Sequence, residues 1–228
     1  MFSRFMLLVV VVSLGACSAP QPTRTIASAP INLFNETLEG WERRGGAADF
    51  TVEDGCIVGR PRPHERNSFL CTTKSFGDFT LDFEFMIDDG FNSGVQIRSR
   101  VDGEGAKERV VGYQVEIDPS SRAWSAGIYE EGLRGWLAPL TSMPEAQTAF
   151  RHGAWNHVKV EAVGPRIRTW INGISAADLT DQASSTGIIA LQVHGVGNAT
   201  QPVSVRWREL QLVPRERTDS FRSGQAKP

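Results

Sequence analysis

Apolar and polar residues alternate at every second position along most of this chain. The longest such run covers residues 79–87, with Phe79, Leu81, Phe83, Phe85 and Ile87 at its apolar positions. Shorter runs of the same period cover residues 95–99, 113–117, 157–163, 167–171, 189–193 and 203–213. Alternation of this kind is typical of β-strands that bury one face. The pattern therefore predicts an all-β fold.

Turn-forming residues separate these predicted strands. Asp88-Asp89-Gly90 and Asp102-Gly103 follow two of them, and Asn172-Gly173 is the dipeptide preferred in two-residue hairpins. The one segment with a helical pattern is short, over residues 143–150. We therefore expect two antiparallel sheets forming a β-sandwich or barrel, with at most that helix.

The N-terminal segment predicts export. Residues 5–14 are almost uniformly apolar, which is too short for a membrane-spanning helix and suits a signal peptide. Leu14-Gly15-Ala16-Cys17 resembles the lipobox of bacterial lipoproteins, although an ordinary signal peptide with an incidental cysteine would look similar. We expect a signal peptide over 1–16, lipidation of Cys17, and anchoring in the outer membrane, because Ser18 rather than Asp follows the cysteine.

Composition places a single domain between two polar ends. Residues 17–30 are rich in Pro, Ser, Thr and Ala and predict a flexible tether, and residues 214–228 predict a disordered tail. The stretch 31–213 is long enough for one β-sandwich. A net charge of -2 without a basic block argues against nucleic acid as a partner, and membrane contact needs only the lipid.

The three cysteines leave one question open. With Cys17 lipidated, Cys56 and Cys71 form an even pair in an oxidising compartment. They flank a turn-rich stretch, so a disulfide and two separately buried thiols are both compatible with the pattern.

Three predicted strands carry unusual polar residues on the side facing away from the core. Amide, guanidinium, carboxylate and imidazole groups occupy these positions, namely Gln96 and Arg98, then Gln114, Glu116 and Asp118, then Gln192 and His194. Such planar groups can bind sugar hydroxyls, while aromatic rings stack on the C–H face of a sugar. The pattern indicates a carbohydrate site, with Trp124 and Tyr129 as candidate stacking walls.

Several short motifs occur in an order that resembles a known family. They cover residues 33–35, 40–41, 50–55, 77–79, 92–98, 112–118, 125–129, 155–157 and 191–195. Together they resemble the 3-keto-disaccharide hydrolase family over about residues 31–212. The resemblance implies a concanavalin-like jelly roll and activity on glycosides already oxidised to a ketone at carbon 3.

A second resemblance involves Glu116 and Asp118. This pair is similar to the start of the Glu-x-Asp-x-x-Glu strand of laminarinase-like glucanases, which hydrolyse with two glutamates. Here Ser121 stands at the position of the second glutamate. The sequence therefore disfavours ordinary retaining hydrolysis.

A 3-keto sugar allows cleavage through an enolate. Its ketone acidifies the proton on carbon 2, and loss of that proton lets the aglycone leave from carbon 1. Glu116 and His194 are the candidate bases, and Arg98, or a divalent metal held by Glu116 and His194, would stabilise the enolate oxygen. Gln96, Gln114, Asp118 and Gln192 would bind hydroxyls.

The main alternative function is a non-catalytic carbohydrate-binding lipoprotein of the same fold, and the next is a structural or partner-binding sandwich.

Overall fold

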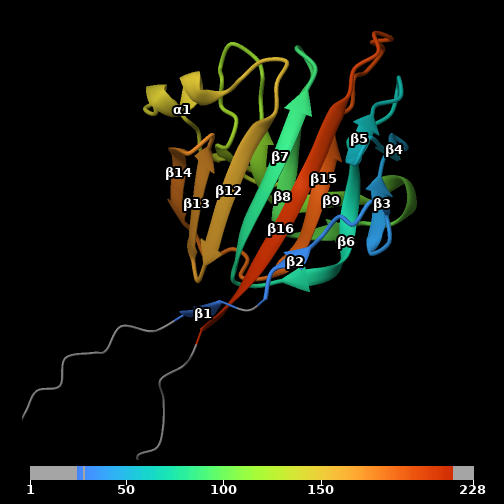
Figure 1. Cartoon of the computed structure of the whole chain (residues 1–228). Helices are drawn as coiled ribbons and strands as arrows, with labels where there is room; N and C mark the ends of the chain where they lie inside the picture. The colour runs from blue at the N-terminus through green and yellow to red at the C-terminus, as the bar shows by residue number, and fades with distance from the viewer. Residues whose placement is uncertain (1–24, 28, 218–228) are drawn as a thin grey trace, which may run out of the picture.

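The structure, a computed structural model, describes residues 25–27 and 29–217. Within these residues the strands form two antiparallel sheets that pack face to face, and the only α-helix is α1 (Pro144–Ala149) (Figure 1). This confirms the predicted all-β sandwich and the short helix over residues 143–150. No described helix has the length and apolar character needed to cross a membrane.

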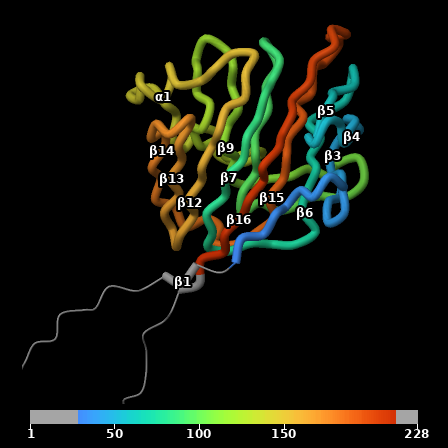
Figure 2. Tube along the Cα trace, in the orientation of Figure 1, coloured from blue at the N-terminus to red at the C-terminus, as the bar shows by residue number. Residues whose placement is uncertain are grey.

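The larger sheet has nine strands among the described residues. Its order is β14 (Ile174–Thr180), β13 (Arg166–Ile171), β12 (Asn156–Val163), β7 (Phe79–Ile87), β16 (Val205–Arg217), β5 (Cys56–Arg60) and β4 (Asp49–Glu53), while β1 (Thr25–Ala27) and β2 (Ile31–Asn32) also pair with β16. Figure 2 shows β16 running beside β7 through the middle of this sheet. The first strands of the domain, β1 and β2, and the last strand, β16, thus belong to one sheet.

The smaller sheet has seven described strands and carries the polar faces noted above. Its order is β11 (Gly135–Ala138), β10 (Ile128–Glu131), β9 (Arg109–Ile117), β8 (Ser93–Asp102), β15 (Gly187–Val193), β6 (Ser68–Phe76) and β3 (Trp41–Gly45). A single 3-10 turn, η1 (Gly105–Lys107), lies between β8 and β9. Since β8 lies between β9 and β15, Gln96, Gln114, Glu116 and Gln192 share one face, whereas Arg98 does not.

The core lies between the two sheets and is built from the alternating apolar positions. Phe79, Leu81, Phe83 and Phe85 of β7 are completely buried, and so is Trp207 of β16. The opposite sheet contributes buried residues of the same kind, including Val95, Ile97, Val115 and Leu191. Period-two alternation directs one face of each strand inward, and this orientation leaves the other face of β8 and β9 to form a site.

The sheet extends beyond the predicted domain boundaries of 31–213. β1 pairs with Arg215–Arg217 of β16, so part of the expected tether and part of the expected tail form a strand pair. The predicted signal peptide 1–16, Cys17, most of the tether and the tail after Arg217 lie outside the described residues.

Cys56 and Cys71 are both free and buried. Cys56 belongs to β5 of the larger sheet and Cys71 to β6 of the smaller one. Burial raises the pKa of the Cys71 thiol to about 12. The structure thus corresponds to the second alternative, two separate thiols held in their unreactive protonated form.

Candidate functional site

A pocket of about 590 Å³ lies on the polar face of the smaller sheet. Neighbouring strands supply its chemical groups, with Gln114 and Glu116 from β9, Tyr129 and Glu131 from β10, and Trp136 from β11. Residues just outside the strands close it, including Asn67, Asn92, Asp118, Arg122 and His194. The topology therefore gathers groups from distant parts of the sequence at one place.

Glu116 is a buried carboxylate on the wall of this pocket, with 5% of its surface exposed. Its Oε1 accepts a hydrogen bond from Asn92 Nδ2 at 2.7 Å, and its Oε2 accepts one from Gln114 Nε2 at 2.8 Å. Burial raises the pKa of Glu116 from 4.5 to about 7, because desolvation of the charge outweighs these two donors. A carboxyl of this pKa can both take up and release a proton near neutral pH.

A chain of hydrogen bonds fixes the amide of Gln114. Ser99 Oγ donates to Gln96 Oε1 at 2.7 Å, and Gln96 Nε2 donates to Gln114 Oε1 at 2.5 Å. The Gln114 oxygen is thereby occupied, so its NH₂ group points to Glu116. Gly94 provides the space, because a Cβ there would lie 2.5 Å from the Gln114 side chain. Gln96 is completely buried and supports the pocket from below rather than lining it.

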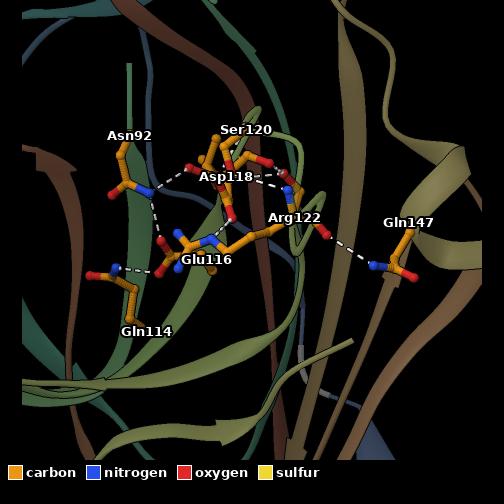
Figure 3. A network of polar contacts seen from close by, with 9 residues as sticks. Asn92, Gln114, Glu116, Asp118, Ser120, Arg122 and Gln147 are labelled. Atoms are coloured by element: carbon orange, nitrogen blue, oxygen red, sulfur yellow. Dashed lines mark hydrogen bonds and ion pairs between the residues drawn. The ribbon is translucent and has the colours of Figure 1, made fainter. Parts of the chain in front are cut away.

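Asp118 anchors the loop that follows β9. Its Oδ1 accepts a hydrogen bond from the backbone of Ser120, and its Oδ2 accepts one from Arg122 Nε at 3.0 Å. Gln147 of α1 donates to the Arg122 carbonyl at 2.9 Å, so the short helix supports this loop from the other side (Figure 3). Asp118 lines the pocket as expected, and Arg122 is a lining cation that the sequence reasoning missed.

Glu131 is another carboxyl of the pocket and is partly buried, and sequence reasoning missed it as well. Its Oε1 accepts a hydrogen bond from Asn67 Nδ2 at 3.1 Å and its Oε2 one from Gln192 Nε2 at 3.3 Å. Burial raises the pKa of Glu131. The period-two pattern offered a signal, because Tyr129, which was singled out, shares a face of β10 with Glu131.

His194 lines the pocket at its exposed edge. Its Nδ1 lies 2.9 Å from the carbonyl oxygen of Gly195. Because a carbonyl only accepts, Nδ1 carries the hydrogen, and in the neutral ring Nε2 keeps its lone pair. The imidazole is therefore oriented as an acceptor.

Aromatic rings form one side of the pocket. Tyr129 and Trp136 line it, with their ring centroids 5.3 Å apart in an edge-to-face arrangement. Trp124 packs edge to face on Trp136 at 4.7 Å and supports it without lining the pocket. Tyr129 thus has the place expected of a stacking wall, and Trp136 is in the place that Trp124 was expected to take.

Arg98 lies outside this pocket. Its guanidinium is completely buried and donates to the carbonyls of Gly77 and Gly164 and to Asp78 Oδ1, at 2.9, 2.7 and 2.8 Å. The backbone of Arg98 has a φ of 46°, within an irregular part of β8, which turns the side chain toward the far end of the sandwich. The structure therefore does not bring Arg98 together with Glu116 and His194.

Gln192 has a supporting place as well. It is completely buried, and its contact with the pocket is the hydrogen bond to Glu131.

Within the described part of the chain, no group of three or more His, Cys, Asp or Glu side chains is arranged to hold a metal ion. The metal proposed for Glu116 and His194 thus gains no support from the donor set.

Comparison with solved structures shows the same fold. The chain aligns with a Bacillus subtilis protein of galectin-like fold at a TM-score of 0.62 and 9% identity, covering 86% of this chain and 100% of that one. A candidate glycosyl hydrolase from Parabacteroides distasonis aligns at 0.56 and 17% identity, covering 80% and 92%. Carbohydrate-binding module CBM66 from Bacillus subtilis aligns at 0.51 and 20% identity, covering 75% and 94%. These alignments confirm the jelly-roll fold.

Comparison of the sequence with protein families is more specific. No curated protein matches the chain. A family match covers residues 29–213, which is nearly the whole domain that the structure describes. It agrees with the resemblance noted over residues 31–212 and connects the chain with carbohydrate chemistry. The chain belongs to the 3-keto-alpha-glucoside-1,2-lyase-like domain family.

Proposed function

We propose that this protein cleaves 3-keto-glycosides by removing the proton from carbon 2 and expelling the aglycone from carbon 1. The observation that carries this proposal is Glu116, a buried carboxyl whose pKa of about 7 suits a general base, on the wall of a polar pocket. Membership of the family supports the substrate class. The polar and aromatic groups of the same pocket suit a sugar ring.

Glu116 is the better placed of the two candidate bases. Both of its oxygens accept one hydrogen bond, from Asn92 and Gln114, and each keeps a second lone pair. These two donors fix the carboxylate in position, so little reorientation is needed before proton transfer. His194, with its Nε2 lone pair at the exposed edge, would bind a hydroxyl or accept a proton from water.

Arg122 takes the role first assigned to Arg98. An enolate oxygen carries negative charge in the transition state and is stabilised by a donor placed beside it in advance. Arg122 lines the pocket and donates from Nε to Asp118, and its Nη groups donate a hydrogen bond to no other side chain among the described residues. The guanidinium carbon of Arg122 also lies 5.7 Å from the Trp136 ring centroid. This contact with the ring restricts the positions that the guanidinium can occupy.

The test is aglycone release from a 3-keto-glucoside by the purified protein, with and without divalent ions, beside the unoxidised glucoside. The keto substrate should be cleaved and the unoxidised one should be inert, because nothing acidifies its carbon 2 proton. Glu116→Gln should lower the rate by about 10²-fold, the usual scale for losing a positioned base. Glu145→Gln, an exposed glutamate on α1, is the matched control and should leave it unchanged.

Deuterated solvent gives a second measurement in the same assay. Substrate recovered before completion, or the product, should carry deuterium at carbon 2 if an enolate forms. Equal cleavage of oxidised and unoxidised glycosides would contradict the proposal. Saturable binding of the sugar without turnover would instead support the carbohydrate-binding alternative.

A further inference from the structure

We propose that Glu131 is the second catalytic group of this pocket, the acid that protonates the aglycone oxygen as it leaves carbon 1. This inference rests on the proposed function and adds a residue and a role to it. The sequence lacks a glutamate three positions after Asp118, where a glucanase-like strand would carry one. The structure supplies a second glutamate to the same pocket from the neighbouring strand β10.

The sheet register places Glu116 and Glu131 on neighbouring strands, β9 and β10. Glu131 pairs with Gly112, which precedes Glu116 by four residues on β9. Four residues span about 13 Å along a strand, and both side chains line the same pocket. The charge of Glu131 acts on Glu116, since it is one of the influences that raise the pKa of Glu116.

The surroundings of Glu131 favour its acid form and fix its position. Burial raises its pKa, while Asn67 and Gln192 each donate to one of its oxygens. Asn67 is itself held, because its Oδ1 accepts the backbone N–H of Gly195 at 2.9 Å. The charges nearest to Glu131 include His194 and Arg109, which oppose this rise. The residue therefore has a fixed carboxyl that can hold a proton and still release it.

Elimination comes first and hydration of the product follows. The C2–H bond breaks and its proton goes to Glu116, while its electron pair forms the enolate. The enolate then re-forms the ketone as a C1=C2 double bond forms, and the C1–O bond breaks with its electron pair going to the aglycone oxygen, which takes the proton of Glu131. In the hydration that follows, the Glu131 carboxylate takes a proton from water as the hydroxide adds to carbon 1, and Glu116 returns its proton to carbon 2.

The experiment compares two 3-keto-glucosides that differ only in how well the aglycone leaves. An alkyl or sugar alcohol is a poor leaving group and needs the acid, whereas p-nitrophenolate leaves readily without it. Glu131→Gln should therefore slow release of the alcohol by about 10²-fold and release of p-nitrophenol by less than about threefold. Because both substrates are assayed with the same sample of the variant protein, a misfolded fraction would lower both rates equally.

Glu116→Gln serves as the reference variant and should slow both substrates, because both need proton abstraction. If Glu131→Gln slows both equally, or neither, while Glu116→Gln slows both, the acid role of Glu131 is wrong and the proposed function stands. If the wild-type protein releases neither aglycone, the proposed function fails and the role of Glu131 fails with it.

Discussion

Glu116 shows how one residue type acquires a new chemistry from its surroundings. An exposed glutamate titrates near 4.5, too low for a base to hold an abstracted proton well at neutral pH. Burial raises this pKa to about 7, and the donors Asn92 and Gln114 keep the ionised form accessible. Burial and hydrogen bonding therefore act in opposite directions, and together they set a pKa near neutral pH.

The raised pKa of Glu116 predicts a pH dependence of stability. Below pH 4.5 the carboxyl is protonated in both the folded and the unfolded chain. As the pH rises, the unfolded chain ionises first, so the folded state loses relative stability between about pH 4.5 and pH 7, by up to about 3 kcal/mol. Urea unfolding of the wild type and of Glu116→Gln at about pH 5 and pH 8 measures this difference. If the free energy of unfolding changes equally with pH in the wild type and in the variant, the pKa of Glu116 is not raised by folding.

At the scale of elements, β8 serves the two ends of the sandwich in different ways. Gln96 on this strand belongs to the chain of amides that leads to Glu116. Two residues later, Arg98 ties the smaller sheet to the turns at Gly77 and Gly164 that flank strands of the larger sheet. An irregularity in the pairing of β8 with β9, between Ile97 and Arg100, separates the two roles.

Arg98→Met should therefore destabilise the fold and spare the chemistry. The change removes the cation beside the buried Asp78 carboxylate, and breaking such a buried pair costs about 3–5 kcal/mol in the free energy of unfolding. Arg100→Met, at an exposed position on the same strand, is the control and should cost little. Urea unfolding gives the stability, and turnover per folded molecule gives the activity. A large loss of turnover in a fully folded Arg98→Met protein would return Arg98 to the catalytic groups.

At the scale of the whole molecule, the two ends of the domain meet in one sheet. β1 and β2 both pair with β16, so the segment that enters the domain lies beside the segment that leaves it. The pocket lies on the smaller sheet. β16 belongs to the larger one (Figure 1). An anchor before β1 would therefore hold the protein at the sheet that does not carry the pocket.

That anchor is a separate prediction, because Cys17 lies outside the described residues. We expect the wild-type protein to incorporate a labelled fatty acid and to fractionate with the outer membrane. Cys17→Ser should lose the label and leave the membrane fraction, while Cys56→Ser, which changes a buried thiol of the domain, should keep it. Label retained by Cys17→Ser would refute the lipobox interpretation.

The sequence by itself determined seven of the strands, the sandwich and much of the polar face. Alternation with period two states which side of each strand is buried, because successive side chains point to opposite faces. Gln114, Glu116, Asp118 and His194 were found in this way, and Tyr129 was expected as a stacking wall; all five line the pocket. The ordered motifs also identified the family, over nearly the range that the family match covers.

Only the tertiary structure decided which of these groups meet and what their chemistry becomes. The left-handed backbone of Arg98 turned a polar-face residue into a buried tie between sheets, and no pattern of residue types records such a local change. Glu131 joined the site through the pairing of β10 with β9, which depends on register rather than on spacing along the chain. The pKa of Glu116 depends on desolvation by residues far apart in sequence, so it exists only once the strands have packed.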